Sequence, residues 1–276
     1  MDVHVTNDSA QFDAAAASFL EADPVRNTVL LTILDTLRAG GGYDDDDPWF
    51  AWAHVEDVVV GAALRTPPYK VALSGMSADA ADALGHRLAS YDLPGAFGDL
   101  ATVATFAAGA NRQHAVNMHE IQHMLTEVKP PPSVPGAARP YAGTDADVYV
   151  RWDADFAAEA GVTRSANPLG SLHTRVSSGG GLWLWDVDDL PVAMCGRSAP
   201  VCGVPRIGPV WTPPEHRRRG YAAALTAFVC SEALAEGARA CTLFADAANP
   251  TSNGVYLRIG FVPAGETVEA IFTSTA

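Results

Sequence analysis

Lysine, cysteine and long hydrophobic runs are scarce in this chain of 276 residues, and each shortage argues against a class of protein. Only two of the 18 basic residues are lysines, and 32 acidic residues give a net charge of −14. A chain this acidic repels polyphosphate, so the sequence predicts no nucleic-acid partner. Charged residues or glycine interrupt the apolar stretches within about ten residues, which is too short for a membrane-spanning helix.

The four cysteines are too scattered for a zinc site or a redox motif. They stand at positions 195, 202, 230 and 241, with no C-x-x-C pair and no cysteine–histidine cluster at zinc spacing. The first thirteen residues have neither a basic region nor an apolar core of the signal-peptide type. We therefore expect reduced cysteines in a cytoplasmic protein. Nothing in the sequence indicates an oligomeric state.

The composition is globular, and a proline-rich segment divides the chain near its middle. Hydrophobic residues make up 48% and charged residues 18%, which suits packed cores. Four prolines fall between positions 130 and 135, and they predict an extended linker over 129–137. The predicted domains are residues 1–128 and 138–276.

The two halves share a faint internal similarity. Residues 49–68 and 181–200 each suggest a hairpin, with an aromatic-rich strand, an acidic turn and a second apolar strand. The similarity spans about twenty residues and indicates a duplicated domain. The second half alternates helices and strands, an α/β pattern. Its predicted elements lie at 144–160, 164–178, 181–187, 190–198, 202–211, 217–236, 240–245 and 251–258, followed by a strand pair from 261.

The clearest chemistry lies where a strand ending at Trp211 leads into the predicted helix over 217–236. Three arginines and Gly220 open this helix. Glycine lacks a Cβ, so a ligand can approach the backbone closely. The first N–H groups of a helix have no intrahelical partner, and the positive end of its dipole lies there. This pattern predicts a phosphate or pyrophosphate ligand.

Residues 217–222, RRRGYA, resemble the R/Q-x-x-G-x-G/A signature of the GCN5-related N-acetyltransferases, the GNAT family. Residues 243–261 resemble a later motif of that family, N-x-x-[SA]-x-x-x-Y-x-x-x-G-F. The residues that match this motif are Asn249, Ser252, Tyr256, Gly260 and Phe261. The resemblance implies an α/β fold of two tandem acyl-CoA N-acyltransferase-like domains. Each would have a mixed, mostly antiparallel central sheet flanked by helices.

The resemblance also implies acetyl-CoA as co-substrate and direct acetyl transfer to a primary amine of a small molecule or protein. Tyr256 would be the general acid facing the thioester sulfur. A phenol with a pKa of about 10 stays protonated at neutral pH, so it can protonate a departing thiolate. The residues expected to contact the co-substrate are Val210, Trp211, Thr212, Arg217, Arg218, Arg219, Gly220, Tyr221, Ala222, Asn249 and Asn253.

No motif identifies the group that takes the proton of the amine. Glu159 and Glu215 are candidates by position, although a solvated carboxylate explains each of them. The rival function is a non-catalytic acyl-CoA-binding or regulatory module, and the presence of Tyr256 favours the enzyme. The first half has no R-x-x-G-x-A segment, so it is expected to be a degenerate copy that has lost the co-substrate site.

A metallohydrolase is a further alternative. His119, Glu120 and His123 match the H-E-x-x-H pattern on a predicted helix over 111–125. The pattern is short and no third ligand is evident nearby, so no metal site is predicted. The aspartates at 44–47 lack the spacing of an EF-hand calcium loop.

Overall fold

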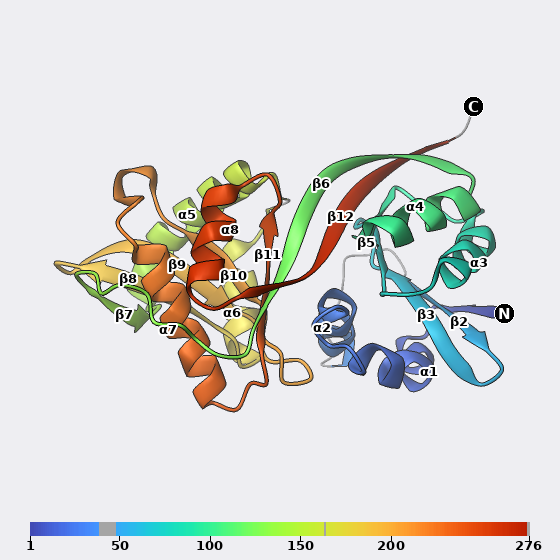
Figure 1. The fold of residues 1–276 in the computed structure, drawn as a ribbon, viewed down its shortest axis with the longest axis horizontal. Helices are drawn as coiled ribbons and strands as arrows, with labels where there is room; N and C mark the ends of the chain where they lie inside the picture. Colours follow the sequence, from blue (N-terminus) through green and yellow to red (C-terminus); the bar gives the residue numbers. More distant parts are fainter. Residues whose placement is uncertain (39–47, 163, 275–276) are drawn as a thin grey trace. The chain divides into compact units, whose positions relative to one another are not determined.

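The computed structural model describes residues 1–38, 48–162 and 164–274, which form two compact units (Figure 1). Unit 1 consists of Met1–Ile121 and Ala264–Ala276, and unit 2 of Gln122–Pro263. These bounds differ from the linker-based boundaries because the last strand of the chain pairs within unit 1. The assignment of two duplicated halves at 1–128 and 138–276 stays a prediction. The aspartates at 44–47 lie outside the described residues.

Unit 1 is a mixed sheet with four helices in its described part. Strands β1 to β4 pair antiparallel in sequence order, β4 pairs parallel with β5, and β12 pairs antiparallel with β5. The elements are β1 (Asp2–Thr6), α1 (Ser9–Glu21), α2 (Thr28–Arg38), β2 (Trp49–Val55), β3 (Val58–Arg65), β4 (Val71–Leu73), α3 (Ala78–Leu88), β5 (Gly95–Asp99), α4 (Leu100–Gly109), β6 (Arg112–Leu125) and β12 (Val262–Ser274). The last four residues of β6 and the first two of β12 belong to unit 2.

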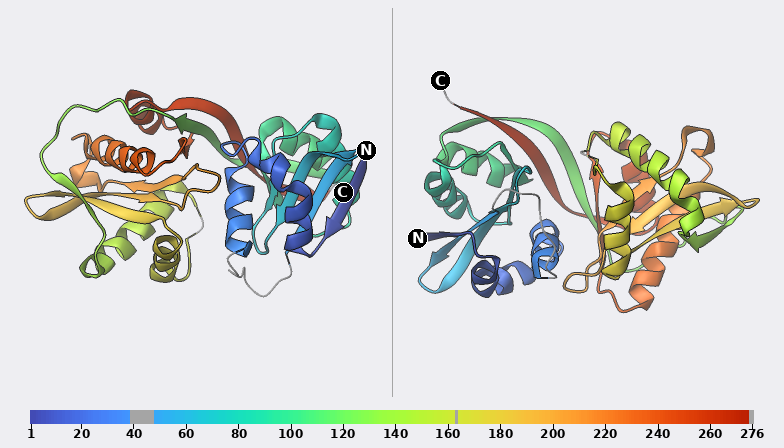
Figure 2. Two further views of the ribbon diagram at one scale, coloured as in Figure 1. Left: turned by 90° about the horizontal axis from the view of Figure 1, so that it is seen from below. Right: turned by 180° about the vertical axis from the view of Figure 1, so that it is seen from behind.

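Unit 2 has a four-stranded antiparallel sheet in the order β10-β9-β8-β7, and β11 lies beside β6 (Figure 2). Alternation along β8 separates two cores, because Leu182 and Leu184 pack with α5, whereas Trp183 and Trp185 pack with α7. The elements are β7 (Ala137–Pro140), η1 (Gly143–Asp145), α5 (Ala146–Ala160), α6 (Pro168–Ser177), β8 (Gly181–Val187), β9 (Leu190–Arg197), β10 (Ile207–Trp211), η2 (Pro214–His216), α7 (Tyr221–Ala235), β11 (Cys241–Asp246) and α8 (Pro250–Arg258).

The predicted hairpins are confirmed as β2–β3 and β8–β9. The predicted helix over 111–125 is wrong, because this segment is strand β6. The histidine spacing suggested a helix, but pairing with distant strands decides the conformation of the segment. The predicted strand pair from 261 is a single strand, β12. The helix predicted from 217 begins at Tyr221, because Arg218 and Gly220 have left-handed backbones with φ of 60° and 87°.

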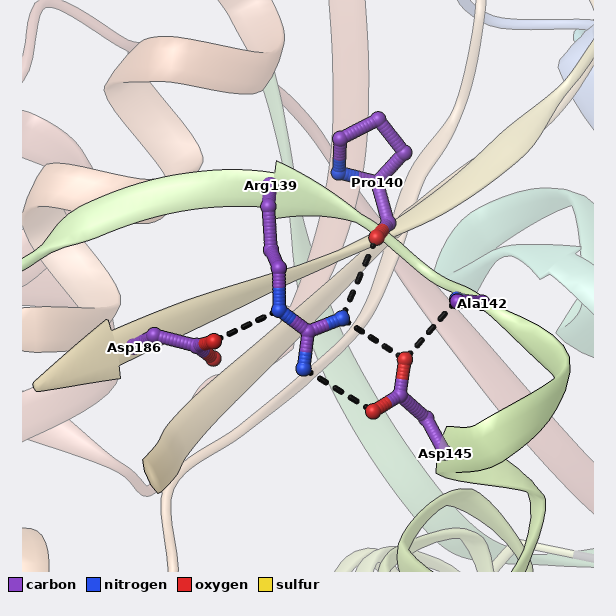
Figure 3. Close-up of polar contacts among 5 residues, drawn as sticks. All are labelled: Arg139, Pro140, Ala142, Asp145 and Asp186. Atoms are coloured by element: carbon purple, nitrogen blue, oxygen red, sulfur yellow. Dashed lines mark hydrogen bonds and ion pairs between the residues drawn. The ribbon is translucent and has the colours of Figure 1, made fainter. Parts of the chain in front are cut away.

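A three-way ionic cluster fastens β7 to β8 and to the start of α5 (Figure 3). Arg139 donates from Nη1 and Nη2 to the carboxylate of Asp145 at 2.7 and 2.9 Å, and from Nε to Asp186 at 2.5 Å. The Asp145 carboxylate also accepts the N–H of Ala142 at 2.8 Å. The side chain of Asp145 is only 9% exposed. The Arg139 guanidinium holds the pKa of Asp145 below its usual value.

The change Arg139→Met is therefore expected to lower the free energy of unfolding at pH 7 by about 2–3 kcal/mol. This is less than for a fully buried pair, because Arg139 is partly exposed. A depressed carboxyl pKa stabilises the fold at neutral pH, and that contribution is lost as the pH falls below about 4. The difference in the free energy of unfolding between variant and wild type, measured by urea unfolding, should then shrink at low pH.

The control is Arg164→Met, which removes the more exposed ion pair with Asp153 and should lower the free energy of unfolding by less than about 1 kcal/mol. If both variants lost the same free energy of unfolding, the ionic cluster around Arg139 would not be the stronger of the two interactions.

Candidate functional site

Two neighbouring parallel strands of unit 2 part from each other at their carboxyl ends. One parallel bridge joins Arg206, just before β10, to Thr242 at the start of β11, and the N–H of Thr242 donates to Pro205 O at 3.1 Å. Beyond this bridge β10 pairs only with β9, and β11 belongs to the other sheet, within the described part of the chain. Backbone groups on the facing edges therefore have no strand partner. Helices α7 and α8 follow these two strands, so their N-termini lie at the carboxyl ends where ligands bind in α/β sheets.

Strand β10 is irregular at this place. Its register against β9 shifts between Ile207 and Val210, which is a bulge. Arg175 of α6 donates from Nη1 to the carbonyl of Gly208 inside the bulge at 2.8 Å. A bulge changes the direction of the following backbone groups, here those of Val210 and Trp211.

The loop between β10 and α7 presents a row of backbone N–H groups. Left-handed conformations at Arg218 and Gly220 alternate with ordinary ones, which is the backbone pattern of anion-binding nests. The first N–H of α7 with a backbone acceptor is that of Ala224, bonded to Gly220 O at 3.0 Å. No acceptor among the described residues bonds the N–H groups of residues 218–223. A Cβ on Gly220 would lie 3.0 Å from Val134 Cγ1, so this position is also sterically tight.

The three arginines of this loop have different surroundings. Arg217 donates from Nη2 to Glu159 at 2.8 Å and from Nε to Thr212 O at 2.9 Å, and its guanidinium lies 4.8 Å from the ring centre of Trp211. These contacts fix the start of the loop. The exposed Arg218 and Arg219 keep their charges at the surface beside the nest. Arg219 donates from Nη2 to the backbone of the loop, at Glu215 O, at 3.2 Å.

The end of β10 and the first part of this loop include buried polar side-chain atoms without a partner in the described part of the chain. They are Trp211 Nε1, Thr212 Oγ1 and His216 Nδ1. Buried polar atoms almost always have a hydrogen-bond partner, so their grouping favours a ligand or ordered water beside β10. The sequence indicated Trp211 and Thr212, but His216 carried no signal.

The two asparagines of the second motif hold the start of α8. Asn249 caps the helix, accepting the N–H of Ser252 on Oδ1 at 3.0 Å. Asn253 is 9% exposed and donates from Nδ2 to the carbonyls of Asp246 and Asn249, both at 2.8 Å. Its Oδ1 faces His123 Nε2 at 2.9 Å. The structure thus shows these side chains tying α8 to the end of β11, which positions Tyr256 one turn later.

Tyr256 is 8% exposed and belongs to the core beside α7. Its ring packs edge-on against Phe261, with centroids 5.8 Å apart, and against His123 at 6.0 Å. Burial raises the pKa of Tyr256 to about 12, so the phenol keeps its proton throughout the physiological range.

His123 is the residue of this region that the sequence did not reveal. It lies on the part of β6 that belongs to unit 2, is 1% exposed, and contacts both Asn253 and Tyr256. Because Asn253 uses its amide nitrogen on two carbonyls, its oxygen must accept from His123 Nε2. His123 Nδ1 is buried without a partner among the described residues. In the sequence this histidine belongs to an apparent zinc motif, and that pattern hid its packing role.

The metallohydrolase alternative is contradicted by the strand conformation of β6. Four residues of strand place His119 and His123 about 13 Å apart, too far to share one ion. His119 instead pairs with Glu266 at 2.9 Å. Within the described ranges no cluster of three His, Cys, Asp or Glu side chains could hold a metal ion. A nucleophilic role for Cys195 is also disfavoured, because burial raises the pKa of its thiol to about 12.

A separate cavity of about 550 Å³ lies between α6 and the start of β8. Its lining includes Tyr141, Leu172, His173, Leu182 and Trp183, and no residue of β10, α7 or α8. It is therefore distinct from the place where β10 and β11 part.

No helix in the described part of the chain is long and apolar enough to cross a membrane. Residues 149–261 match the family described as "Acetyltransferase (GNAT) family". This match contains the loop before α7 and the second motif on α8. No curated relative matches the sequence.

Solved structures share the fold over both units. An X-ray structure of a Drosophila protein is 16% identical, with a TM-score of 0.69, and the match covers 99% of each chain. A GCN5-related N-acetyltransferase from Sphaerobacter thermophilus is 15% identical with a TM-score of 0.64, covering 99% of this chain and 96% of that one. A tandem GNAT protein from the clavulanic acid biosynthesis pathway is 14% identical with a TM-score of 0.58, covering all of both chains. The fold is therefore that of two tandem acyl-CoA N-acyltransferase-like domains, as the sequence predicted.

Proposed function

We propose that this chain, a member of the acetyltransferase (GNAT) family through its residues 149–261, transfers the acetyl group of acetyl-CoA to a primary amine of a small molecule or protein. The family uses acyl-CoA as co-substrate, and the choice of acetyl-CoA and of an amine acceptor is our proposal. The observation that carries it is the row of unbonded N–H groups at 218–223, placed where β10 and β11 part.

In this proposal the nest and the start of α7 bind the pyrophosphate. Residues Arg218 to Ala222 supply backbone N–H groups and two exposed guanidinium groups, while Arg217 holds the loop through Glu159 and Trp211. The unpaired edge of β10 at Val210, Trp211 and Thr212 faces the pantetheine and the thioester. Asn249 and Asn253 support the site through α8, and our proposal that they also touch the co-substrate rests on the motif alone.

The chemical step is a direct transfer. The neutral amine attacks the acetyl carbonyl carbon, a C–N bond forms, and backbone N–H groups near Val210 and Trp211 stabilise the oxygen as it gains charge. The C–S bond then breaks, and its electron pair leaves on the sulfur. Tyr256 donates its proton to the thiolate, and the proton lost by the amine is taken up by a base or by water.

The described part of the first unit lacks the features that carry this proposal. Strands β4 and β5 pair in parallel through Val71 with Ala96 and Ala72 with Phe97, where the related strands of unit 2 part. Ser77 caps α3 with its own hydroxyl, which accepts the N–H of Ala80 at 3.3 Å. Ser77 thus takes up one N–H of this helix start, and we propose that each chain binds a single acyl-CoA, in unit 2.

We expect Glu159 to hold Arg217 in place through their ion pair and not to act as the general base for the amine. Glu159→Gln should then weaken acyl-CoA binding by less than about fivefold, because an exposed ion pair contributes little free energy. It should leave kcat nearly unchanged. Loss of a general base would instead lower kcat by at least about 100-fold. Glu215→Gln tests the other candidate base in the same way, because Arg219 contacts the backbone carbonyl of Glu215 and not its carboxylate. Titration and steady-state rates of both variants distinguish the two roles.

The proposed activity is tested by incubating the chain with acetyl-CoA and a panel of primary amines. Release of free thiol, together with the mass of an acetylated amine, is the expected result. Binding of acetyl-CoA without transfer to any amine of the panel or to protein amino groups would instead support a non-catalytic acyl-CoA-binding module.

A further inference from the structure

We propose that His4 and His54 form a binding site for one divalent transition-metal ion on the outer strand pair of unit 1. The two histidines lie on the antiparallel strands β1 and β2, where His4 is paired with Trp52 and Asp2 with His54. This register makes them diagonal neighbours on one face of the sheet. Their Nε2 atoms lie 3.0 Å apart, and the rings are 5.0 Å apart with 24° between their planes.

The tautomer of His54 follows from its second ring nitrogen. His54 Nδ1 lies 2.5 Å from the backbone oxygen of Glu56, which can only accept a hydrogen bond. Nδ1 must therefore carry a proton, and the neutral ring keeps a lone pair on Nε2. A backbone carbonyl on the far nitrogen is the usual outer support of a metal-binding histidine. Without a metal ion, His4 donates a hydrogen bond from its own Nε2 to the lone pair on His54 Nε2.

A metal ion can replace that hydrogen bond. With metal–nitrogen bonds of about 2.0–2.1 Å, two nitrogens 3.0 Å apart subtend roughly 95° at the ion, as in two adjacent coordination positions. The proton of His4 moves to its Nδ1, so both neutral rings present lone pairs and no net proton is released. Imidazole nitrogen suits Zn²⁺, Ni²⁺ and Cu²⁺ better than Mg²⁺ or Ca²⁺.

The position of the His4 ring is fixed in advance by packing. It stacks on Trp52 at 5.1 Å with 14° between the planes, and Trp52 is only 8% exposed. Trp52 packs in turn against Phe12, whose side chain is fully buried. A rigid platform reduces the entropy lost when the ion binds. No third His, Cys, Asp or Glu side chain in the described ranges completes the site, so water occupies the remaining positions and the ion exchanges.

The test is a calorimetric titration of the full, reduced chain with Ni²⁺ in a buffer that does not bind metal. We expect one ion per chain, and His4→Gln or His54→Gln should each weaken binding by at least about tenfold, since even the loss of an outer support costs that much. His114→Gln is the matched control, because His114 is an exposed histidine on β6 of the same unit. Both test positions accept glutamine at the surface, and circular dichroism checks that the variants fold.

A second measurement reports the two rings directly. In ¹⁵N NMR spectra of the histidine side chains, Zn²⁺ should shift the Nε2 signals of His4 and His54 and leave those of His114 unchanged. The proposal is overturned if no ion binds, or if binding survives in both glutamine variants.

Discussion

The change Gly220→Glu is expected to abolish acyl-CoA binding, lowering the affinity by at least about 100-fold, while the chain stays folded. The glutamate places a negative charge where the proposed pyrophosphate accepts the N–H groups of the nest. Gly220 also has φ of 87°, and any Cβ there lies 3.0 Å from Val134 Cγ1. A side chain therefore both repels the ligand and moves the loop. Calorimetric titration with acetyl-CoA measures the effect.

The control for this prediction is Gly237→Glu. Gly237 follows the other end of α7, also has a left-handed backbone, with φ of 101°, and has open space where a Cβ would lie. Both changes carry the backbone cost of a non-glycine residue, about 1–2 kcal/mol. The Gly237 variant should nevertheless bind acetyl-CoA with wild-type affinity. Equal binding by the two variants would show that the start of α7 is not the phosphate site.

The change Tyr256→Phe is expected to lower kcat by about 100- to 10,000-fold, the usual range for loss of a general acid. Phenylalanine keeps the ring contacts with Phe261 and His123, so the dissociation constant of acetyl-CoA and the unfolding midpoint should change little. Steady-state rates with the amine found in the panel measure the effect. A variant with wild-type kcat would remove Tyr256 from the mechanism.

The pH dependence of the rate adds a separate check on Tyr256. Because its pKa is raised to about 12, the phenol remains protonated through any practical assay range. A decline of activity between pH 8 and pH 10 would then come from another group, and it should persist in Tyr256→Phe. If the decline disappeared in the variant, the phenol would have to titrate far below this value.

Local patterns were sufficient to predict most of unit 2. The strand over 181–187 is predicted residue for residue, because aromatic and aliphatic side chains alternate there between two acidic or glycine-rich ends. The end of α5 follows from Gly161, which adopts a left-handed backbone with φ of 67°. The loop before α7 was predicted from Gly220 and the arginines, although residues 217–220, the first four of the predicted helix, are not helical. In each case the signal lies within a few residues of the feature.

Long-range pairing explains what the sequence did not show. Strand β6 has histidines at helical spacing, and it is a strand because it pairs with strands more than a hundred residues away in sequence. The same kind of pairing assigns residues 264–274 to unit 1 and brings His123 against Tyr256. In the described part of unit 1, the cap formed by Ser77 and the parallel pairing of β4 with β5 differ from the loop and parted strands of unit 2, and the sequence showed this difference only as a missing motif.

Titration of the full wild-type chain with acetyl-CoA shows whether the protein has a single acyl-CoA site, in unit 2. Saturable binding of one molecule per chain is the predicted result, since only the loop before α7 presents unbonded N–H groups beside parted strands in the described residues. Absence of binding, or binding of two molecules per chain, would rule out a single acyl-CoA site in unit 2.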